Sequence, residues 1–352
     1  ALQAQSFSGA TDAYNTAVGH NAGKAVTTGV NNTLIGGLAG DEITEGTRNT
    51  AVGTSVMTKT TTGVDNTAIG GIDAAANATL GTNTTGTNNV AVGGGALFGN
   101  TTASNNTAVG YRALKTNTTA SGNVAVGGLA LDANTTGSAN TAVGYNALTD
   151  NIAGVNNTAV GQSALGNVLN DGNTAIGLSA GAGISSGQYN TSLGLVSMTA
   201  ATYVGSYNSS IGYNANPSAA DSSGQFTLGD TNISNLRCND QSISALSDSR
   251  DKTDVIDSPY GLDFINTVRP VQFKWDTRDG NVKDGSTRIG FLAQELLTAT
   301  DGNNAVLDLV LEENPNKLEA KYGNLLPVLV KALQELSAKN DALEARIKTL
   351  EG

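Results

Sequence analysis

The chain has 352 residues, of which 44 are glycine and only 14% are charged. A single histidine and a single cysteine exclude an intrachain disulfide and a Cys/His zinc site built by one chain, and the net charge of −11 argues against a nucleic-acid-binding protein. No apolar run reaches the length of a membrane-spanning helix. We therefore expect no membrane insertion, no nucleic-acid partner, no metal and no cofactor.

The composition changes near residue 246. Residues 1–246 carry 12 acidic and 6 basic residues, whereas the remaining 106 positions carry 18 acidic and 13 basic residues. Of the 44 glycines, 37 lie before residue 247. The two parts of the chain therefore fold on different principles, and we treat them separately.

The first part is a repeat array. The phrase Asn-Thr-Ala-Val-Gly and its variants end at thirteen glycines, most of them 17 residues apart: Gly19, Gly36, Gly53, Gly70, Gly93, Gly110, Gly127, Gly144, Gly161, Gly177, Gly194, Gly212 and Gly229. The longest interval, 23 residues from Gly70 to Gly93, marks an insertion. A disordered linker would not keep this phase. Seventeen residues are too few for a helical repeat and indicate one coil of a parallel β-solenoid, in which stacked coils share a core.

Within a copy the residues alternate as in a short strand. Thr141 and Val143 face one way, and Asn140 and Ala142 face the other. We expect the Val position, together with a later Leu such as Leu148, to form the core. The small Ala and Gly residues would then make a face that a second copy approaches closely, which favours a trimer.

The repeat phrase resembles that of the YadA-type head domains of trimeric adhesins, which also occurs in phage and viral fibre proteins. The resemblance covers about residues 10–230 and implies a homotrimer of left-handed β-rolls, although those heads use shorter coils. We therefore assign residues 1–230 to a solenoid shaft of thirteen copies and residues 231–246 to a transition segment.

The second part predicts a small α+β domain, residues 247–324, that ends in a helix, residues 325–352. Ser258 and Pro259 are typical of a helix start, and residues 269–275 and 288–296 predict a strand and a strand that runs into a helix. The last helix repeats leucine every seven residues, which predicts a coiled coil with one polar seam position. The expected seam is Leu329, Leu333, Leu336, Asn340, Leu343, Ile347 and Leu350. The alternative is an amphipathic helix that packs on its own domain.

The order of these motifs resembles the self-cleaving intramolecular chaperone domain at the C-terminus of phage endosialidases, tail spikes and fibres. The matching motifs are Ser247-Asp248-x-Arg250-x-Lys252, Arg269-Pro270, Ile289-Gly-x-x-Ala-Gln-Glu295 and the terminal heptads. The resemblance implies a domain that trimerises, sets the register of the preceding fibre and is then cut off. Ser247 would be the nucleophile at the Leu246–Ser247 bond and Lys252, held neutral, its general base. Asp248 and Arg250 would support the site or the trimer.

We expect a structural fibre or spike protein of a phage or virus, located in the virion and used in host attachment. Its enzymatic activity would be at most one self-cleavage per chain. Its partners would be itself, as a homotrimer, and a host surface glycan or protein receptor. The alternative is the head of a bacterial surface adhesin whose C-terminal domain only trimerises. A polysaccharide-degrading spike would need an enzymatic domain that residues 1–352 do not contain.

Overall fold

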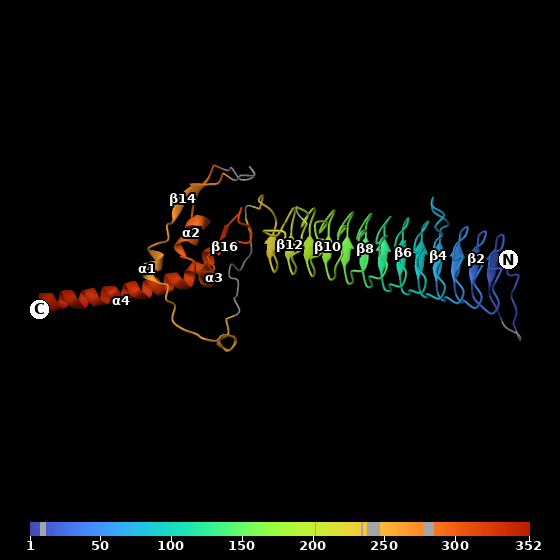
Figure 1. Ribbon diagram of the computed structural model, residues 1–352, viewed down its shortest axis with the longest axis horizontal. Coiled ribbons are helices and arrows are strands. Elements are labelled where there is room, and N and C mark those ends of the chain that lie inside the picture. Colours follow the sequence, from blue (N-terminus) through green and yellow to red (C-terminus); the bar gives the residue numbers. More distant parts are fainter. Residues whose placement is uncertain (8–11, 201, 234, 238–246, 277–284) are drawn as a thin grey trace. The chain divides into compact units, whose positions relative to one another are not determined.

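The computed structural model describes residues 1–7, 12–200, 202–233, 235–237, 247–276 and 285–352. The chain divides into two compact units, Ala1–Asp230 and Thr231–Gly352. In the first unit, thirteen three-residue strands form one parallel sheet in sequence order, which confirms the predicted solenoid of 17-residue coils (Figure 1). The strands are β1 Thr16–Val18, β2 Thr33–Ile35, β3 Thr50–Val52, β4 Thr67–Ile69, β5 Val90–Val92, β6 Thr107–Val109, β7 Val124–Val126, β8 Thr141–Val143, β9 Thr158–Val160, β10 Thr174–Ile176, β11 Thr191–Leu193, β12 Ser209–Ile211 and β13 Phe226–Leu228.

The asparagine of the repeat joins successive coils. The backbone N–H of Asn140 donates to Oδ1 of Asn123 at 2.9 Å, and Nδ2 of Asn140 donates to the carbonyl of Gly154 at 2.8 Å. The same pattern continues at Asn157. Because these side chains are buried and hydrogen-bonded, the repeat asparagines are structural and are not a polar surface for a ligand.

The repeat glycine has two reasons to be glycine. Gly144 has a φ of +140°, a conformation that residues with a side chain rarely adopt. A Cβ placed there would lie 2.5 Å from the carbonyl oxygen of Gly161 in the next coil. The coils therefore stack at a distance that only glycine permits.

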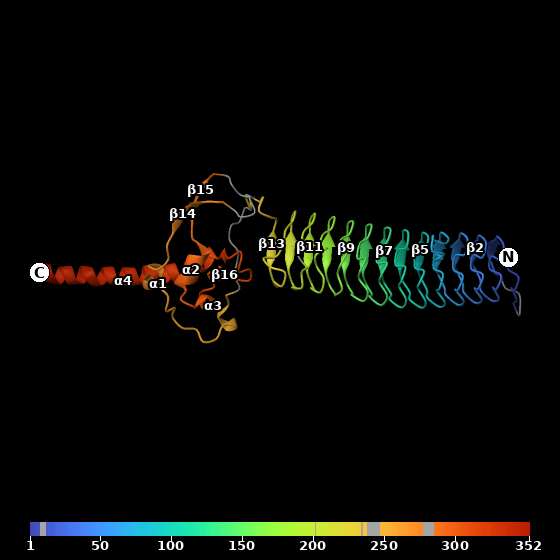
Figure 2. The same cartoon turned by 45° about the horizontal axis from the view of Figure 1, so that its top comes forward.

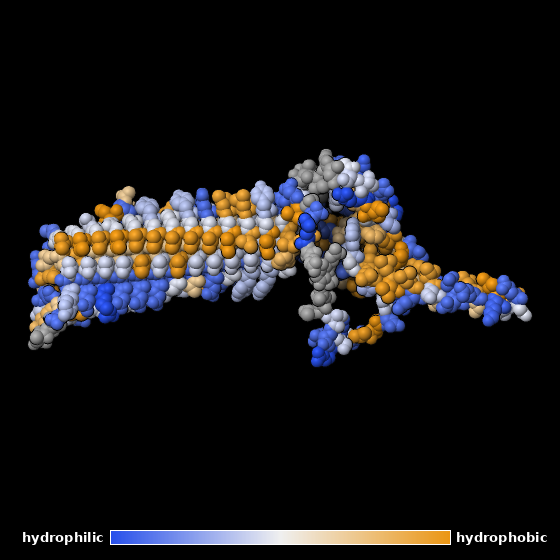
Figure 3. Space-filling view, turned by 180° about the vertical axis from the view of Figure 1, so that it is seen from behind, coloured by the Kyte–Doolittle hydropathy of each residue, from blue (hydrophilic) through white to orange (hydrophobic). Residues whose placement is uncertain are grey.

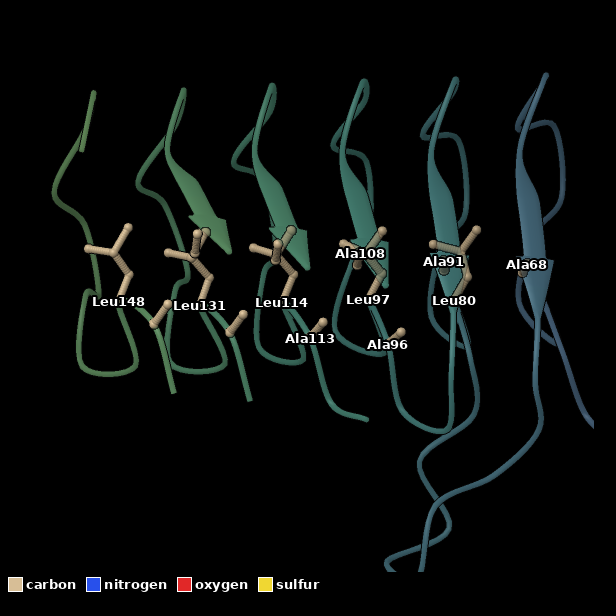
Figure 4. Packing of buried hydrophobic residues seen from close by; sticks show 14 of the residues in the cluster. Ala68, Leu80, Ala91, Ala96, Leu97, Ala108, Ala113, Leu114, Leu131 and Leu148 are labelled. Atoms are coloured by element: carbon tan, nitrogen blue, oxygen red, sulfur yellow. The ribbon is translucent and has the colours of Figure 1, made fainter. Parts of the chain in front are cut away.

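The expected assignment of the two strand faces is wrong. The middle residue of the strand, such as Ala142, is fully buried, whereas Val143 is 36% exposed. Figure 4 shows the core: leucines such as Leu97 and Leu114 form a row along the shaft and lie close to the strand alanines. The coil interior is narrow, and one leucine from the opposite wall already fills it. The strand can therefore direct only a small residue inward, and its larger valine points outward.

Some coils have glycine at the core leucine position, and they compensate three residues later. Gly40 is followed by Ile43 and Gly181 by Ile184, and both isoleucines are fully buried. A Cβ on Gly40 would lie 2.7 Å from Cδ1 of Ile43, so the isoleucine occupies the space that a leucine fills elsewhere. The core is therefore filled in every such coil, but by a side chain three residues later in the sequence.

The insertion after Gly70 is anchored by one buried carboxylate. Asp73 accepts hydrogen bonds from the backbone N–H groups of Ala75 and Asn77 and from Nε of Arg112, the last at 2.5 Å. The strands on either side, β4 and β5, remain paired in register, Thr67 with Val90. The extra residues therefore leave the stacking undisturbed.

The second unit contains a small α+β region and a long helix (Figure 2). Its core is formed by Leu296, Leu307, Leu309, Val310, Leu325 and Val328. The elements are the 3₁₀ turn η1 Ser249–Asp251, α1 Leu262–Ile265, β14 Val271–Lys274, β15 Thr287–Gly290, α2 Ala293–Ala299, α3 Asn304–Leu307, β16 Val310–Leu311, β17 Glu319–Ala320, η2 Tyr322–Asn324 and α4 Leu325–Glu351. Strands β14 and β15 pair antiparallel, as do β16 and β17.

Most predicted elements of this unit are present, but the first helix begins later than expected. Helix α1 begins at Leu262, and Ser258 does not cap it. Instead, Oγ of Ser258 accepts from the backbone N–H of Tyr260. The cap comes from a distant residue: Oε2 of Glu335 in α4 accepts from the backbone N–H of Leu262 at 2.8 Å. A local sequence pattern could not reveal a cap that lies 73 residues away.

Candidate functional site

The residues that carry the predicted chemistry lie at the start of the second unit. Asp248 closes the turn η1, because its Oδ1 accepts from the backbone N–H of Arg250 at 2.9 Å. The guanidinium of Arg250 also bonds the Asp248 carboxylate, with Nη2 at 2.5 Å from Oδ2. The hydrogen bonds from Arg250 lower the pKa of Asp248 below its usual value. Asp248 and Arg250 therefore shape the turn.

This turn brings the two predicted catalytic side chains together. Nζ of Lys252 donates to Oγ of Ser247 at 2.6 Å. A neutral lysine amine at this distance can accept the proton of the serine hydroxyl and so activate it as a nucleophile. Leu246, the residue on the other side of the predicted scissile bond, lies outside the described residues.

The pair is open to solvent in a single copy. Every residue from Ser247 to Pro259 is exposed, including Val255 and Ile256. The hydrogen bonds of this stretch are local and join residues that are close in sequence. Nothing in the described part of one copy therefore covers the Ser247–Lys252 pair.

Two further motif residues form an ion pair. The guanidinium of Arg269 bonds the carboxylate of Glu295 through two hydrogen bonds, with Nε at 2.9 Å from Oε2 and Nη2 on Oε1. This contact lowers the pKa of Glu295 and raises that of Arg269. It ties the segment before β14 to the first turn of α2. The sequence motifs contained both residues, but only the structure shows that they meet.

Helix α4 presents two apolar faces. One face, with Leu325, Val328 and Ala332, is buried in the unit and packs against α1. The other face is the predicted seam, and all of its large apolar residues are exposed; Leu333 is 65% exposed and Leu350 84%. The seam residues are Leu329, Leu333, Leu336, Asn340, Leu343, Ile347 and Leu350. The helix thus packs on its own domain with one face, as the alternative interpretation held, and leaves the heptad face uncovered.

Neither metal nor membrane chemistry is indicated in the part of the chain that the structure describes. There, no three His, Cys, Asp or Glu side chains group in a way that would hold a metal ion. The same residues contain no helix with the length and apolarity that crossing a membrane requires. The single histidine, His20, is exposed after a repeat glycine and belongs to neither feature described above.

Comparison with known proteins identifies part of the second unit. Residues 247–307 match the family model described as chaperone of endosialidase. The match begins at Ser247 and includes Lys252, Arg269 and Glu295. No curated protein matches the chain. The predicted resemblance to this chaperone family is therefore confirmed for the residues that contain the turn and the ion pair.

Proposed function

We propose that the chain is a fibre or spike shaft of a phage or virus that assembles as a homotrimer and carries its own removable folding chaperone. The observation that supports this most strongly is the uncovered heptad seam of α4 in a unit that matches the chaperone of endosialidase. Leucines and an isoleucine at seven-residue spacing are typical of a coiled coil, in which helices from other copies cover these side chains and remove them from water. Asn340 at a seam position would fix the register of the three helices.

The chaperone would act on the shaft through its trimer. Three copies joined at one end have a high effective concentration for one another, which favours their association along the remaining length. Such a clamp also relieves the slow step of pairing long-range β-structure. The described residues of the shaft form a stack of equivalent coils. They contain no helix that could join three copies at one end in this way.

The Ser247–Lys252 pair would then release the clamp. Because Ser247 follows the scissile bond, its Oγ would attack the Leu246 carbonyl carbon through a five-membered ring. Lys252 would take the hydroxyl proton and return it to the leaving nitrogen, so that the peptide C–N bond breaks and an ester forms. Water would hydrolyse the ester and give a carboxylate at Leu246 and a free amine at Ser247.

Assembly would control the timing of this step. The pair is exposed in one copy, and Lys252 must give up its proton before it can act as a general base. Covering the turn by neighbouring copies would remove water and favour the neutral amine. The cut would therefore follow trimer formation and occur once per chain.

The test compares the purified chain with Ser247→Ala and Lys252→Ala on denaturing gels and by mass spectrometry. The parent chain should split into fragments of 246 and 106 residues, and each variant should stay whole and trimeric by light scattering. A conservative Lys252→Arg variant should also stay whole, because a guanidinium does not lose its proton. Cleavage of Ser247→Ala at the same bond would show that another protease cuts the chain.

The adhesin alternative makes a different prediction in the same experiment. An adhesin head with a simple trimerisation domain would remain uncut in every variant, including the parent chain. The 2.6 Å contact between Lys252 and Ser247 favours the self-cleaving fibre. Host attachment through a surface glycan or protein would be the role of such a fibre in the virion.

A further inference from the structure

One face of the shaft sheet carries an apolar row over its whole length. It contains the third residue of every strand, which is always valine, isoleucine or leucine and is exposed or half-buried. The residues of this row, here called the outer stripe, are Val18, Ile35, Val52, Ile69, Val92, Val109, Val126, Val143, Val160, Ile176, Leu193, Ile211 and Leu228. Figure 3 shows the outer stripe as an unbroken row along the shaft.

The neighbouring row on the same face is uncharged. It consists of the first residue of each strand, mostly threonine, with Val90, Val124 and Phe226 among them. Neither row contains a charged residue. Parallel sheets normally have both faces covered, and a contiguous apolar surface of this extent marks a contact with another molecule.

We propose that the outer stripe is the surface through which the shafts of the homotrimer contact one another. The inference rests on the proposed trimer and replaces the expected contact through the alanine face, because Ala142 and its equivalents are already buried in the solenoid core. The partner must be a second copy, because it has to present an apolar row of the same length, with rungs about 4.8 Å apart. A parallel copy of the same shaft meets this requirement at every coil.

This surface holds copies together but does not select their register. The outer stripe has thirteen equivalent rungs, so a slip by one coil would still leave twelve of them in contact. Each rung would meet a residue of nearly the same size. The register must then come from outside the shaft, which agrees with a trimeric clamp at the C-terminal end.

The test measures how accessible a cysteine is at two positions of the assembled full chain. Val143→Cys places the thiol on the outer stripe, and Ile152→Cys places it on another part of the same region of the shaft; these side chains are 36% and 53% exposed in one copy. Both are made in a Cys238→Ser, Ser247→Ala chain, which keeps one cysteine and no serine nucleophile. The probe is a maleimide, and light scattering is recorded on each sample.

If the outer stripe is the interface, the thiol of the Val143→Cys trimer should react at least about tenfold more slowly than the thiol of the Ile152→Cys trimer, because the neighbouring copies exclude the reagent. Rates within about twofold in a trimeric sample would overturn the inference and leave the proposed fibre standing. A monomeric sample would contradict the proposed function itself. The two failures are therefore distinguishable.

A second pair of variants does not depend on reagent access. Val143→Asp/Val160→Asp changes two adjacent rungs of the outer stripe, and Ile152→Asp/Leu169→Asp changes two exposed aliphatic residues elsewhere on the shaft. The first pair should lower the thermal midpoint of the full-length trimer clearly, because it would bury six carboxylates per trimer. The control pair should leave the midpoint nearly unchanged. Equal midpoints for both pairs would overturn the inference.

Discussion

In the shaft, each coil repeats the same few contacts: an asparagine that bonds the next coil, an alanine and a leucine in the core, and a glycine at the corner. In residues 247–352 nearly every contact occurs once, such as Glu335 on the N–H of Leu262 or Arg269 on Glu295. Repetition gives the shaft stability that grows with its length, but its contacts are alike at every coil. Unique contacts specify one arrangement, and the second unit leaves uncovered the heptad seam that the proposed trimer would bury. Each region provides what the other lacks.

The largest effect is expected from breaking the seam. Leu336→Asp/Leu343→Asp should abolish trimer formation and leave the shaft misfolded or aggregated, because six buried carboxylates cannot be accommodated in a coiled coil. Size-exclusion chromatography with light scattering measures this. Ala338→Asp/Ala345→Asp, on the same helix and also seven residues apart but off the seam, is the control and should assemble normally. Soluble trimers of normal shape from the seam variant would show that the shaft finds its register unaided.

The second prediction concerns the close stacking of the coils. Gly144→Ala should lower the free energy of unfolding of the shaft by about 3 kcal/mol or more, because backbone strain and the clash with Gly161 add together. Gly122 also has a positive φ, +73°, but a Cβ there meets nothing within 4 Å. Gly122→Ala should therefore cost only about 1 kcal/mol. Equal losses in urea unfolding would mean that conformation, and not close approach, requires the repeat glycine.

The third prediction concerns the asparagine row. Asn140→Ala would leave the buried N–H of Asn157 without its acceptor and would remove one of the two side-chain donors to the carbonyl of Gly154, the other being Asn151. The expected loss is about 1–3 kcal/mol in the free energy of unfolding. The exposed Asn167→Ala, which removes one bond to the carbonyl of Ala182, is the control and should cost less than about 0.5 kcal/mol. If Asn140→Ala leaves the free energy of unfolding unchanged, the coils are held together without the hydrogen bonds of the asparagine row.

The smallest effect should come from the insertion after Gly70, the longest interruption of the repeat. Burial raises the pKa of Asp73, but the hydrogen bonds from Asn77, Arg112 and Ala75 outweigh burial and hold it below its ordinary value. Such a group stabilises the folded state above the pKa of an unfolded aspartate, about 3.9, and that contribution is lost as the pH falls through the lower folded pKa.

The thermal midpoint of the parent chain should therefore fall more steeply below about pH 4 than that of Asp73→Asn. At neutral pH the variant should be the less stable of the two, because its amide carries no charge to pair with Arg112 and has one acceptor oxygen where the carboxylate of Asp73 uses two. Parallel pH profiles would show that the ion pair of the insertion contributes nothing measurable.

The sequence predicted the solenoid, its period, its thirteen copies and the long helix, because each is a pattern repeated many times. It did not predict which face of the strand points inward. Alternation places Ala142 and Val143 on opposite faces of the strand but does not tell which face is buried. Hydrophobicity and size favour valine in the core, and this is the expectation that the structure overturns. The decisive quantity is the distance to the opposite wall, set by Leu148 and its neighbours.

The prediction of Ser247 and Lys252 as a catalytic pair rests on different evidence. A serine and a lysine five residues apart occur in most proteins, so the spacing of Ser247 and Lys252 carries little information by itself. The combination with Arg269, Glu295 and the heptads carried the resemblance that the family match confirms for residues 247–307. The capping of α1 by Glu335 could not be predicted, since nothing near Leu262 in the sequence points to a residue in α4.

Strands β4 and β5 stay paired in register although the chain between them contains an insertion. This has a consequence for how the shaft can change in length. The chain leaves the stack after Gly70 and returns with every later strand still in phase. Length can therefore be gained in two ways: a duplicated coil extends the rod, and a loop at a corner adds residues without moving any coil. The corner at residues 71–78 is the natural place to graft a foreign peptide, which the rod would display at a fixed height without altering its own spacing.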